Sequence, residues 1–301
     1  MKKQKFAIAL GFFDGVHLGH AKLLERTLEV SREKDLVPTV YTFDRHPVTA
    51  LTGKSIPLLN SVDDREFILK EQFGIQNIIF ARFDQKLMNT NWRTFIHDIL
   101  GEQLNAGHLV AGWDYSFGKN GEGNTELLRS EASTLGIGCD IVDRVVLNGI
   151  TVSSTHIRNL VADGDMENAA LFLGHPHLLS GEVISGKRLG RTLGIPTVNI
   201  SIPPNIQKPA KGVYVTRVHI AGDERIFTGV TNVGTKPTVT EDDTILTETH
   251  IVDFEGNLYG SKIRLEFLQY LRPEIRFPGL EELKKQILGD IKSARELLSS
   301  S

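Results

Sequence analysis

Two histidines spaced three residues apart are the first candidates for chemistry in this sequence. His17 and His20 lie in GFFDGVHLGH (11–20), directly after the apolar run FAIAL (6–10). Residues i and i+3 of a helix share a face, and a helix N-terminus offers free N–H groups and partial positive charge. Two imidazoles at such a place would bind a phosphate and the negative charge that develops on it.

The same His-x-x-His spacing fits two other interpretations, a metal-binding pair and solvated surface histidines. Taken alone, the spacing favours these ordinary outcomes over a catalytic role. The metal interpretation is the weaker one here, because no third ligand stands at a useful spacing.

A second polar cluster lies in TVSSTHIR (151–158), before a stretch with helical periodicity. The hydroxyls of Ser154 and Thr155 and the forked guanidinium of Arg158 would clamp phosphate oxygens beside a nucleotide-binding sheet. The alternative is a serine that caps a helix, followed by a surface arginine.

A third cluster, SGKRLGRTLGIPTVNI (185–200), is rich in glycine, basic residues and hydroxyls. Its glycines would let the backbone approach a phosphate, although the segment also fits a flexible basic loop. It is not a Walker P-loop, because the G-x-x-x-x-G-K-[ST] pattern is absent. Thr197 and Asn199 alternate along a predicted strand, so they share a face that suits Mg²⁺ or is simply a buried polar pair.

The first half of the chain alternates predicted strands with predicted helices, which indicates parallel βαβ units. The strands are predicted at 6–10, 36–43, 77–83 and 108–115, and the helices at 20–34, at 91–104 and from Ser61 onwards. The helix at 20–34 has Ala21, Leu24 and Leu28 on its apolar face. Parallel sheets bind ligands at the carboxyl ends of their strands, which is where GFFDGVHLGH falls.

After Gly174 the pattern changes to short alternating runs between glycine or proline turns, which predicts an antiparallel sheet or small barrel. The runs are 178–185, 212–220, 225–233, 247–254 and 262–271. The last predicted helix, 280–298, has an apolar face made of Leu283, Ile287, Ile291, Ala294 and Leu298. We therefore predict an α/β domain over 1–174 and a β domain over 175–301.

Composition narrows the class of protein. A length of 301 residues suits two domains, and a formal net charge of −3 without a basic block argues against a nucleic-acid partner. Asp14 interrupts the resemblance of the N-terminus to a signal peptide, and no stretch approaches the ~18 apolar residues of a membrane span. The single cysteine, Cys139, cannot form an internal disulfide. We expect a cytoplasmic protein without a membrane partner, of unspecified oligomeric state.

Four motifs in the first half resemble those of a known enzyme family. FDGVHLGH, TFDRHP (42–47), AGWDYSFGKNGEGN (111–124) and VSSTHIR occur in this order. They resemble the adenylyltransferase half of the bacterial bifunctional riboflavin kinase/FAD synthetases, which belong to the nucleotidylyltransferase superfamily. The second half resembles the riboflavin kinase domain of that family, through GRTLGIPTVNI, GVY, TNVGTKPT, ETHIVDF, LYG and FLQYLRPEIRF.

The resemblance implies a Rossmann-like nucleotidylyltransferase domain followed by a small flavokinase-like antiparallel barrel with a C-terminal helix. It implies ATP-dependent phosphorylation of riboflavin to FMN in the C-terminal domain. It also implies transfer of AMP from ATP to FMN in the N-terminal domain, giving FAD and pyrophosphate, with Mg²⁺ as cofactor.

The resemblance also implies roles for individual residues. The catalytic residues would be His17 and His20 on the reacting phosphates and Glu248 as the base for the ribityl hydroxyl; a surface glutamate is the alternative for Glu248. ATP and phosphate contacts would come from Gly11, Phe13, Asp14, Gly15, Ser154, Thr155, Arg158, Gly186, Lys187, Gly190, Arg191 and Thr192. Flavin contacts would come from Asp44, Asp114, Phe117, Arg272 and Glu274, and Mg²⁺ contacts from Thr197 and Asn199.

The sequence departs from the family pattern in three residues and in starting directly on its first predicted strand. Arg45 replaces a proline, Val198 an alanine and His177 a tyrosine. Two other functions remain open: a flavin-binding regulator that retains one activity, and a nucleotidylyltransferase for another phosphate ester. The complete set of polar residues argues against the first, and the kinase-like second half argues against the second.

Overall fold

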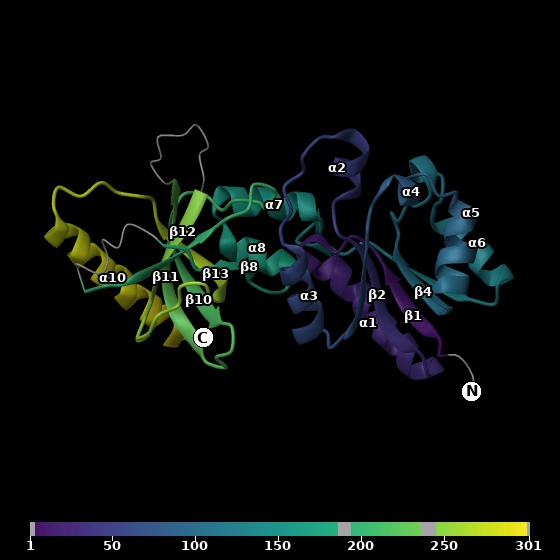
Figure 1. Ribbon diagram of the computed structural model, residues 1–301, viewed down its shortest axis with the longest axis horizontal. Helices are drawn as coiled ribbons and strands as arrows, with labels where there is room; N and C mark the ends of the chain where they lie inside the picture. Colours follow the sequence, from purple (N-terminus) through teal and green to yellow (C-terminus); the bar gives the residue numbers. More distant parts are fainter. Residues whose placement is uncertain (1–3, 186–193, 236–244, 300–301) are drawn as a thin grey trace. The chain divides into compact units, whose positions relative to one another are not determined.

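The structure is a computed structural model that describes residues 4–185, 194–235 and 245–299 (Figure 1). The phosphate contacts predicted at Gly186, Lys187, Gly190, Arg191 and Thr192 lie outside these residues. The chain forms two compact units. Unit 1 comprises Met1–Leu58 and Arg65–Ser154, and unit 2 comprises Leu59–Asp64 and Thr155–Ser301.

Unit 1 is built on a five-stranded parallel sheet with the order β3-β2-β1-β4-β5. The strands are β1 (Phe6–Leu10), β2 (Val37–Phe43), β3 (Asn77–Ala81), β4 (Ala106–Gly112) and β5 (Gly138–Val142). Chain order reverses between β1 and β4, and such a switch point is where open α/β sheets bind ligands. The predicted Rossmann-like architecture is confirmed.

Helices and aromatic side chains complete unit 1. The helices are α1 (Leu18–Lys34), α2 (Pro47–Thr52), α3 (Val62–Glu71, whose first residues belong to unit 2), α4 (Gln85–Met88), α5 (Trp92–Thr94), the π-helix η2 (Phe95–Gln103) and α6 (Thr125–Thr134). Two 3₁₀ turns, η1 (Asp14–Val16) and η3 (Lys119–Gly121), and a short hairpin, β6 (Val146–Leu147) with β7 (Ile150–Thr151), lie in the loops. Phe95 and Leu100 of η2 and Leu128 of α6 pack with Ile8 and Leu109 of the sheet. This core fixes the strands whose ends carry the polar loops.

Unit 2 contains a six-stranded antiparallel sheet with the order β8-β13-β10-β11-β12-β9. The strands are β8 (His177–Glu182), β9 (Thr197–Ser201), β10 (Gly212–Ile220), β11 (Ile226–Thr235), β12 (Ile245–Ile251) and β13 (Lys262–Arg272). Just past the end of β8, Ile184 N donates to Asn199 O of the other edge strand at 2.8 Å. The sheet therefore curls toward closure, and the predicted antiparallel barrel is confirmed.

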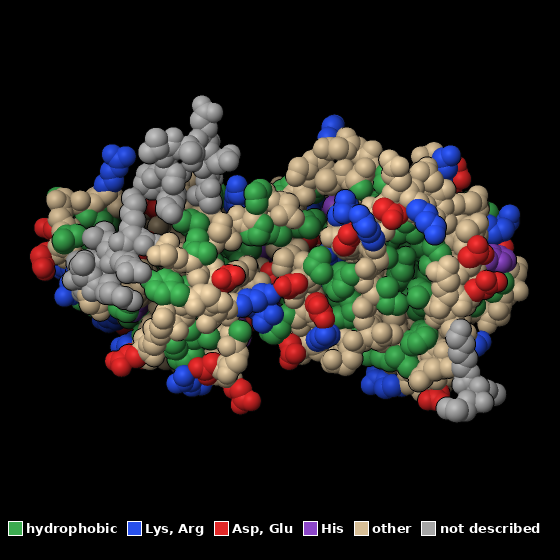
Figure 2. Space-filling view, in the orientation of Figure 1, with side chains coloured by type: hydrophobic (Ala, Val, Ile, Leu, Met, Phe, Trp, Pro, Cys, Tyr) green, Lys and Arg blue, Asp and Glu red, His purple; other side chains and the backbone are tan. Residues whose placement is uncertain are grey.

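Among the described residues of the C-terminal part, the helices are α7 (Ser154–Asp163), α8 (Met166–Leu173) and α10 (Leu280–Ser299). Ile291 and Ala294 of α10 pack on Val215 and Val230 of the sheet, so the predicted terminal helix is confirmed. Within the described ranges, no helix has the length and apolar character needed to cross a bilayer. On the face shown in Figure 2, acidic and basic side chains are interspersed.

The compact units divide after Ser154, whereas the change in sequence pattern lies near 174. Helix α8 belongs to unit 2 and buries Met166, Phe172 and Leu173. Unit 2 also includes 59–64, where Asn60 Nδ2 donates to Leu178 O at 3.0 Å. The boundary at 174/175 remains a prediction about the extent of the two functional domains.

Candidate active sites

The turn after β1 forces the backbone into a conformation that side chains rarely adopt. Phe13, Gly15 and Val16 have φ angles of 57°, 81° and 42°. A β-branched valine at positive φ is strained, and such strain is typical of functional turns. A side chain at position 11 would crowd the ring of Phe13, because a Cβ atom on Gly11 would lie 3.1 Å from it. The turn delivers His17 to the N-cap position of α1.

His17 and His20 stack on one another at this helix N-terminus. Their ring centroids are 3.7 Å apart with an interplanar angle of 13°. His20 N donates to His17 Nδ1 at 3.3 Å, so the ring proton of neutral His17 sits on Nε2. Burial, followed by the charges of His17 and Arg65, lowers the pKa of His20 well below its ordinary value. At Gly19, a Cβ would lie 3.0 Å from His17 Cε1, so glycine there makes room for the ring.

Acidic residues follow two other strands at the same edge of the sheet. Asp44 comes directly after β2, and its Oδ1 accepts from Phe83 N at 2.9 Å. Arg45 lies with its Nε 3.6 Å from Asp44 Oδ1. Asp114 follows β4. The structure thus places both acidic side chains predicted to contact flavin in loops at the carboxyl ends of parallel strands.

Phe117 lies deeper than the other predicted flavin residues. It is 7% exposed, and its ring centroid is 5.4 Å from that of Phe95 and 5.6 Å from that of Tyr115. Its backbone pairs with Gly123 across the loop. Phe117 therefore anchors the loop that carries Asp114.

The serine motif reaches the first turn through Ser154. Ser154 Oγ donates to Asp14 O at 2.9 Å, although 140 residues separate them in the chain. Within unit 2, Arg158 Nη2 donates to Thr155 Oγ1 at 3.0 Å. The structure thus brings Ser154 to the GFFDG turn and pairs Thr155 with Arg158 on the first turn of α7.

Unit 2 has a polar face where β9 runs beside β12. Glu248 is the register partner of Asn199, and His250 is the partner of Thr197. Directly paired residues in a sheet point to the same side, and so do residues two apart. Thr197 Oγ1 donates to Glu248 Oε1 at 2.6 Å. The predicted base and both predicted Mg²⁺ ligands therefore share one face.

Two further polar side chains on this face were missed in the sequence. Asn232 of β11 is the other register partner of Glu248, and its Nδ2 donates to Glu274 Oε1 at 3.1 Å. His250 Nδ1 donates to Pro196 O at 2.9 Å, next to Thr197. His250 stands two positions from Glu248, and Asn232 lies within the quoted motif TNVGTKPT, so strand alternation could have identified both.

Arg272 has a different set of partners from the other residues predicted near flavin. Its Nη2 donates to Asp290 Oδ2 of α10 at 2.7 Å, and its Nη1 donates to Pro273 O at 3.1 Å. The Arg272 and Asp290 side chains are 15% and 6% exposed. The pair fastens the end of β13 to α10, just before the segment that carries Glu274.

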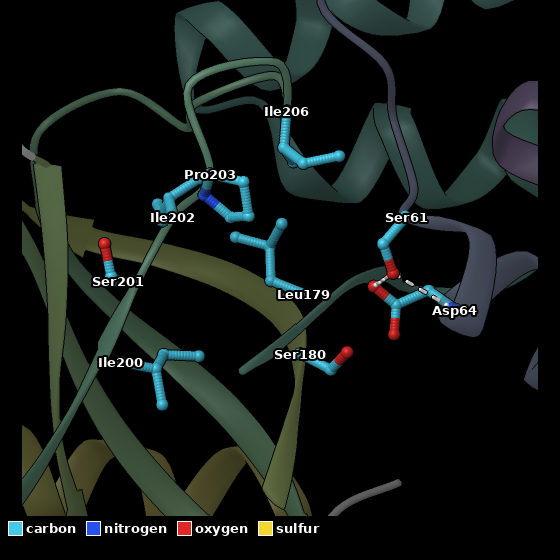
Figure 3. A pocket seen from close by; sticks show the side chains of 9 residues that line it. All are labelled: Ser61, Asp64, Leu179, Ser180, Ile200, Ser201, Ile202, Pro203 and Ile206. Carbon is cyan, nitrogen blue, oxygen red and sulfur yellow. Dashed lines mark hydrogen bonds between the residues drawn. The ribbon is translucent and has the colours of Figure 1, made fainter. Parts of the chain in front are cut away.

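A small pocket in unit 2 lies apart from the predicted site residues (Figure 3). It is lined by Ser61, Asp64, Leu179, Ser180, Ile200, Ser201, Ile202, Pro203 and Ile206. Ser61 Oγ donates to Asp64 Oδ2 at 2.8 Å and accepts from Asp64 N at 3.1 Å, which caps α3. The pocket marks where 59–64 packs within unit 2 and holds none of the predicted catalytic residues.

Comparison with known proteins matches both halves of the chain. The family described as FAD synthetase matches residues 1–156, and the family described as riboflavin kinase matches residues 173–298. Bifunctional riboflavin kinase/FMN adenylyltransferases are similar over almost the whole chain. The protein from Haemophilus influenzae is 35% identical over 99% of this chain and 96% of its own length, and that from Listeria monocytogenes is 33% identical over 96% and 91%.

A solved structure shares the whole fold. It is described as a macrolide-efflux protein from Streptococcus pneumoniae, and it superposes with a TM-score of 0.84 at 28% identity over 98% of this chain and 95% of its own. Both halves of the chain therefore match families, and the curated relatives are at least 33% identical over almost their whole length. The chain belongs to the family of bifunctional riboflavin kinase/FMN adenylyltransferases.

Proposed function

We propose that this chain catalyses two successive steps of flavin cofactor synthesis. Unit 2 phosphorylates riboflavin with ATP to give FMN, and unit 1 transfers AMP from a second ATP to FMN, giving FAD and pyrophosphate. The observation that carries the proposal is that each unit has its own polar cluster. The stacked His17–His20 pair lies at the start of α1, and the Thr197–Glu248 pair lies on the barrel strands.

In unit 1, a phosphate oxygen of FMN attacks the α-phosphorus of ATP, and the bond to pyrophosphate breaks. His17 and His20 lie at the N-terminus of a 17-residue helix, where ring N–H groups and the helix dipole meet the developing negative charge. The turn residues Gly11, Phe13, Asp14 and Gly15 surround the same place. Positioning and electrostatic stabilisation suffice for such a transfer, so no covalent intermediate is required.

The remaining polar groups of the first reaction hold its substrates. Ser154, Thr155 and Arg158 bind the distal phosphates of ATP through hydroxyl and guanidinium hydrogen bonds. Asp44 and Asp114 face FMN from the loops after β2 and β4, and Phe117 supports the second of these loops. In this assignment Arg45, paired with Asp44, sets the charge at the edge of the flavin site.

In unit 2, Glu248 accepts the proton of the ribityl hydroxyl as its oxygen attacks the γ-phosphorus of ATP and ADP leaves. The Thr197 hydroxyl orients the carboxylate by donating to Oε1. Oxygen ligands of the kind that Thr197 and Asn199 offer suit Mg²⁺, so these two residues would hold the ion together with the ATP phosphates. When bound, the ion neutralises phosphate charge. Arg272, held by Asp290, and Glu274, held by Asn232, shape the flavin side.

The substrates are ATP and flavins, and the formal net charge of −3 offers no strong attraction for nucleic acid. We infer an enzyme of the cytoplasm that works without a nucleic-acid or membrane partner.

Incubation of the purified chain with riboflavin, ATP and Mg²⁺, followed by chromatography of the flavins, tests the proposal. FMN should form first and FAD second, and chelation of Mg²⁺ should stop both steps. Accumulation of FMN without FAD at saturating ATP would show that unit 1 is not a working adenylyltransferase and would favour a protein that retains one activity.

A further inference from the structure

Arg65, in α3, is a charged side chain with no exposed surface. Its relative exposure is 0%, and it ranks among the largest fully buried side chains of the described chain. Burying a guanidinium costs several kcal/mol unless its donors and its charge are compensated. The neighbours that supply this compensation show what Arg65 does.

The guanidinium bridges two polar loops of unit 1. Arg65 Nη1 donates to Phe12 O at 2.8 Å, and Nη2 donates to Phe43 O at 3.0 Å. Phe12 belongs to the GFFDG turn that leads to His17, and Phe43 immediately precedes Asp44. Thr42 reinforces the link, because its hydroxyl donates to Phe12 O at 2.8 Å and accepts from Arg65 Nη1 at 3.3 Å. One planar group therefore fixes the end of β2 to the turn after β1.

An aromatic ring and two carboxylates near Arg65 favour the charged form of its guanidinium. Its Cζ lies 4.6 Å from the ring centroid of Phe12, a cation–π contact. Burial lowers the pKa of Arg65 to about 10, against the opposite effect of the Asp14 and Asp44 carboxylates. Arg65 is thus a cation at neutral pH. Its charge acts on His20, whose other neighbours are the stacked ring of His17 and the ring of Phe13.

We propose that Arg65 is a positioning residue for adenylyl transfer. It holds the loop that carries Asp14 and His17 at a fixed separation from the loop that carries Asp44, so that ATP and FMN meet in line. This inference rests on the proposed function of unit 1. Nothing in a sequence pattern distinguishes this arginine from a solvated one in a helix.

Two substitutions in the full-length chain separate geometry from charge. Arg65→Lys keeps the charge but cannot donate to both carbonyls from a fixed fork, so kcat for FAD synthesis should fall by roughly 10–100-fold, the effect of a small misplacement of reacting groups. Its pH profile should stay like that of the wild type. Arg65→Met removes the charge as well, so kcat should fall at least as far, and the imidazole limb of the profile should move to higher pH.

Folding and general effects are controlled within the same chain. Both tryptophans, Trp92 and Trp113, lie in unit 1, so their fluorescence during urea unfolding reports the folding of that unit. Riboflavin phosphorylation in unit 2 should be unchanged in every variant. Arg26→Lys is the matched control, because Arg26 also pairs with carboxylates, Asp140 and Glu29, away from the histidines. Its FAD synthesis should equal that of the wild type.

Thr42→Val keeps the test decisive if Arg65 variants do not fold. It removes the hydroxyl that donates to Phe12 O while preserving shape, and it should lower kcat without moving the pH profile. Folded Arg65 variants with wild-type kcat would overturn the proposal. So would losses of kcat that only follow the unfolded fraction while the Met variant keeps the wild-type profile.

A failure of the proposed function can be distinguished from a failure of the inference about Arg65. Wild-type chain that makes no FAD would count against the proposed function, whereas an NMR titration of the His20 ring needs no turnover. In that titration the pKa of His20 should be higher in Arg65→Met than in the wild type, and an unchanged titration would refute the action of Arg65 on His20.

Discussion

Thr197 Oγ1 donates a 2.6 Å hydrogen bond to Glu248 Oε1, linking the edge strand β9 to β12. The two residues are 51 positions apart in the chain and diagonal in the register, since Glu248 pairs directly with Asn199. The hydrogen bond holds one oxygen of the Glu248 carboxylate against the neighbouring strand. The contact joins the motif PTVN to the motif ETHIVDF, and it supports the proposed role of Glu248 as an oriented base.

Replacing Glu248 by glutamine should lower riboflavin phosphorylation by about 10²–10⁴-fold, the range for a positioned general base. Thr197→Val should lower kcat less, because the carboxylate remains but loses its orienting donor. FAD synthesis from supplied FMN should not change in either variant. Initial rates of both reactions provide the measurement, and Glu182→Gln, at an exposed glutamate of β8, is the matched control. Full kinase activity in Glu248→Gln would exclude this residue as the base.

The double substitution His17→Ala with His20→Ala should have the opposite pattern. FAD synthesis should fall by at least ~10²-fold, because two groups that stabilise the developing phosphate charge are lost. Phosphorylation of riboflavin should continue at the wild-type rate. His97→Ala removes a histidine of the same unit that pairs with Glu131 at 2.6 Å outside the site, and it should leave catalysis intact. Loss of both activities in a well-folded histidine variant would contradict two separate sites.

Local sequence patterns predict the helices, the strands and the polar motifs, but they predict only some of the residues that each helix or strand buries. Periodicity predicts that the helix over 20–34 buries Ala21, Leu24 and Leu28, whereas its buried residues are Leu23, Leu24, Thr27, Val30 and Ser31. Thr27 and Ser31 can be buried because their hydroxyls donate to Leu23 O at 2.8 Å and to Thr27 O at 2.7 Å. A periodicity that counts only apolar residues cannot detect such self-satisfied polar groups.

Long-range packing is the other part that the sequence does not reveal. The sequence around Ser61 predicts the start of a helix, and Ser61 does cap α3. That the same segment belongs to unit 2, through Asn60 and Leu178, depends on a contact across 118 residues. Arg65 follows four positions later and is fully buried, although charged residues in helices are mostly exposed. Both facts are properties of the tertiary structure.

His177 should make the stability of unit 2 depend on pH. It is 1% exposed, and neither ring nitrogen has a hydrogen-bond partner among the described residues. Burial, with a smaller effect of His175, lowers the pKa of His177 from an ordinary 6.5 to about 3. Between these values the unfolded chain binds a proton that the folded unit does not, so stability is complete above 6.5 and is lost as pH falls toward 3.

The measurement is urea unfolding of the full chain by circular dichroism at pH 7 and at pH 5.5, with tryptophan fluorescence followed in parallel for unit 1. Wild-type unit 2 should lose about 1 kcal/mol more than His177→Phe over this interval, because the variant has no group to protonate. Equal losses in the two proteins would show that His177 is protonated as easily in the folded unit as in the unfolded chain.

Fragments of the C-terminal half should differ in stability according to whether they contain α7 and α8. A fragment that starts at Ser153 should fold and phosphorylate riboflavin. One that starts at Leu173 should be less stable by roughly 3–6 kcal/mol, since it lacks Met166 and Phe172, two buried side chains worth about 1.5–3 kcal/mol each.

Both fragments lack Asp64, whose Oδ1 lies 3.8 Å from Arg264 Nε, so both should be less stable than unit 2 in the full chain. Full-length Asp64→Asn should reproduce only the part of that loss that comes from this ion pair, because the fragments also lack the bond from Asn60 Nδ2 to Leu178 O. Thermal unfolding and kinase rates of the four proteins decide the matter, and equal stability of the two fragments would place the working boundary at 174 rather than at 154.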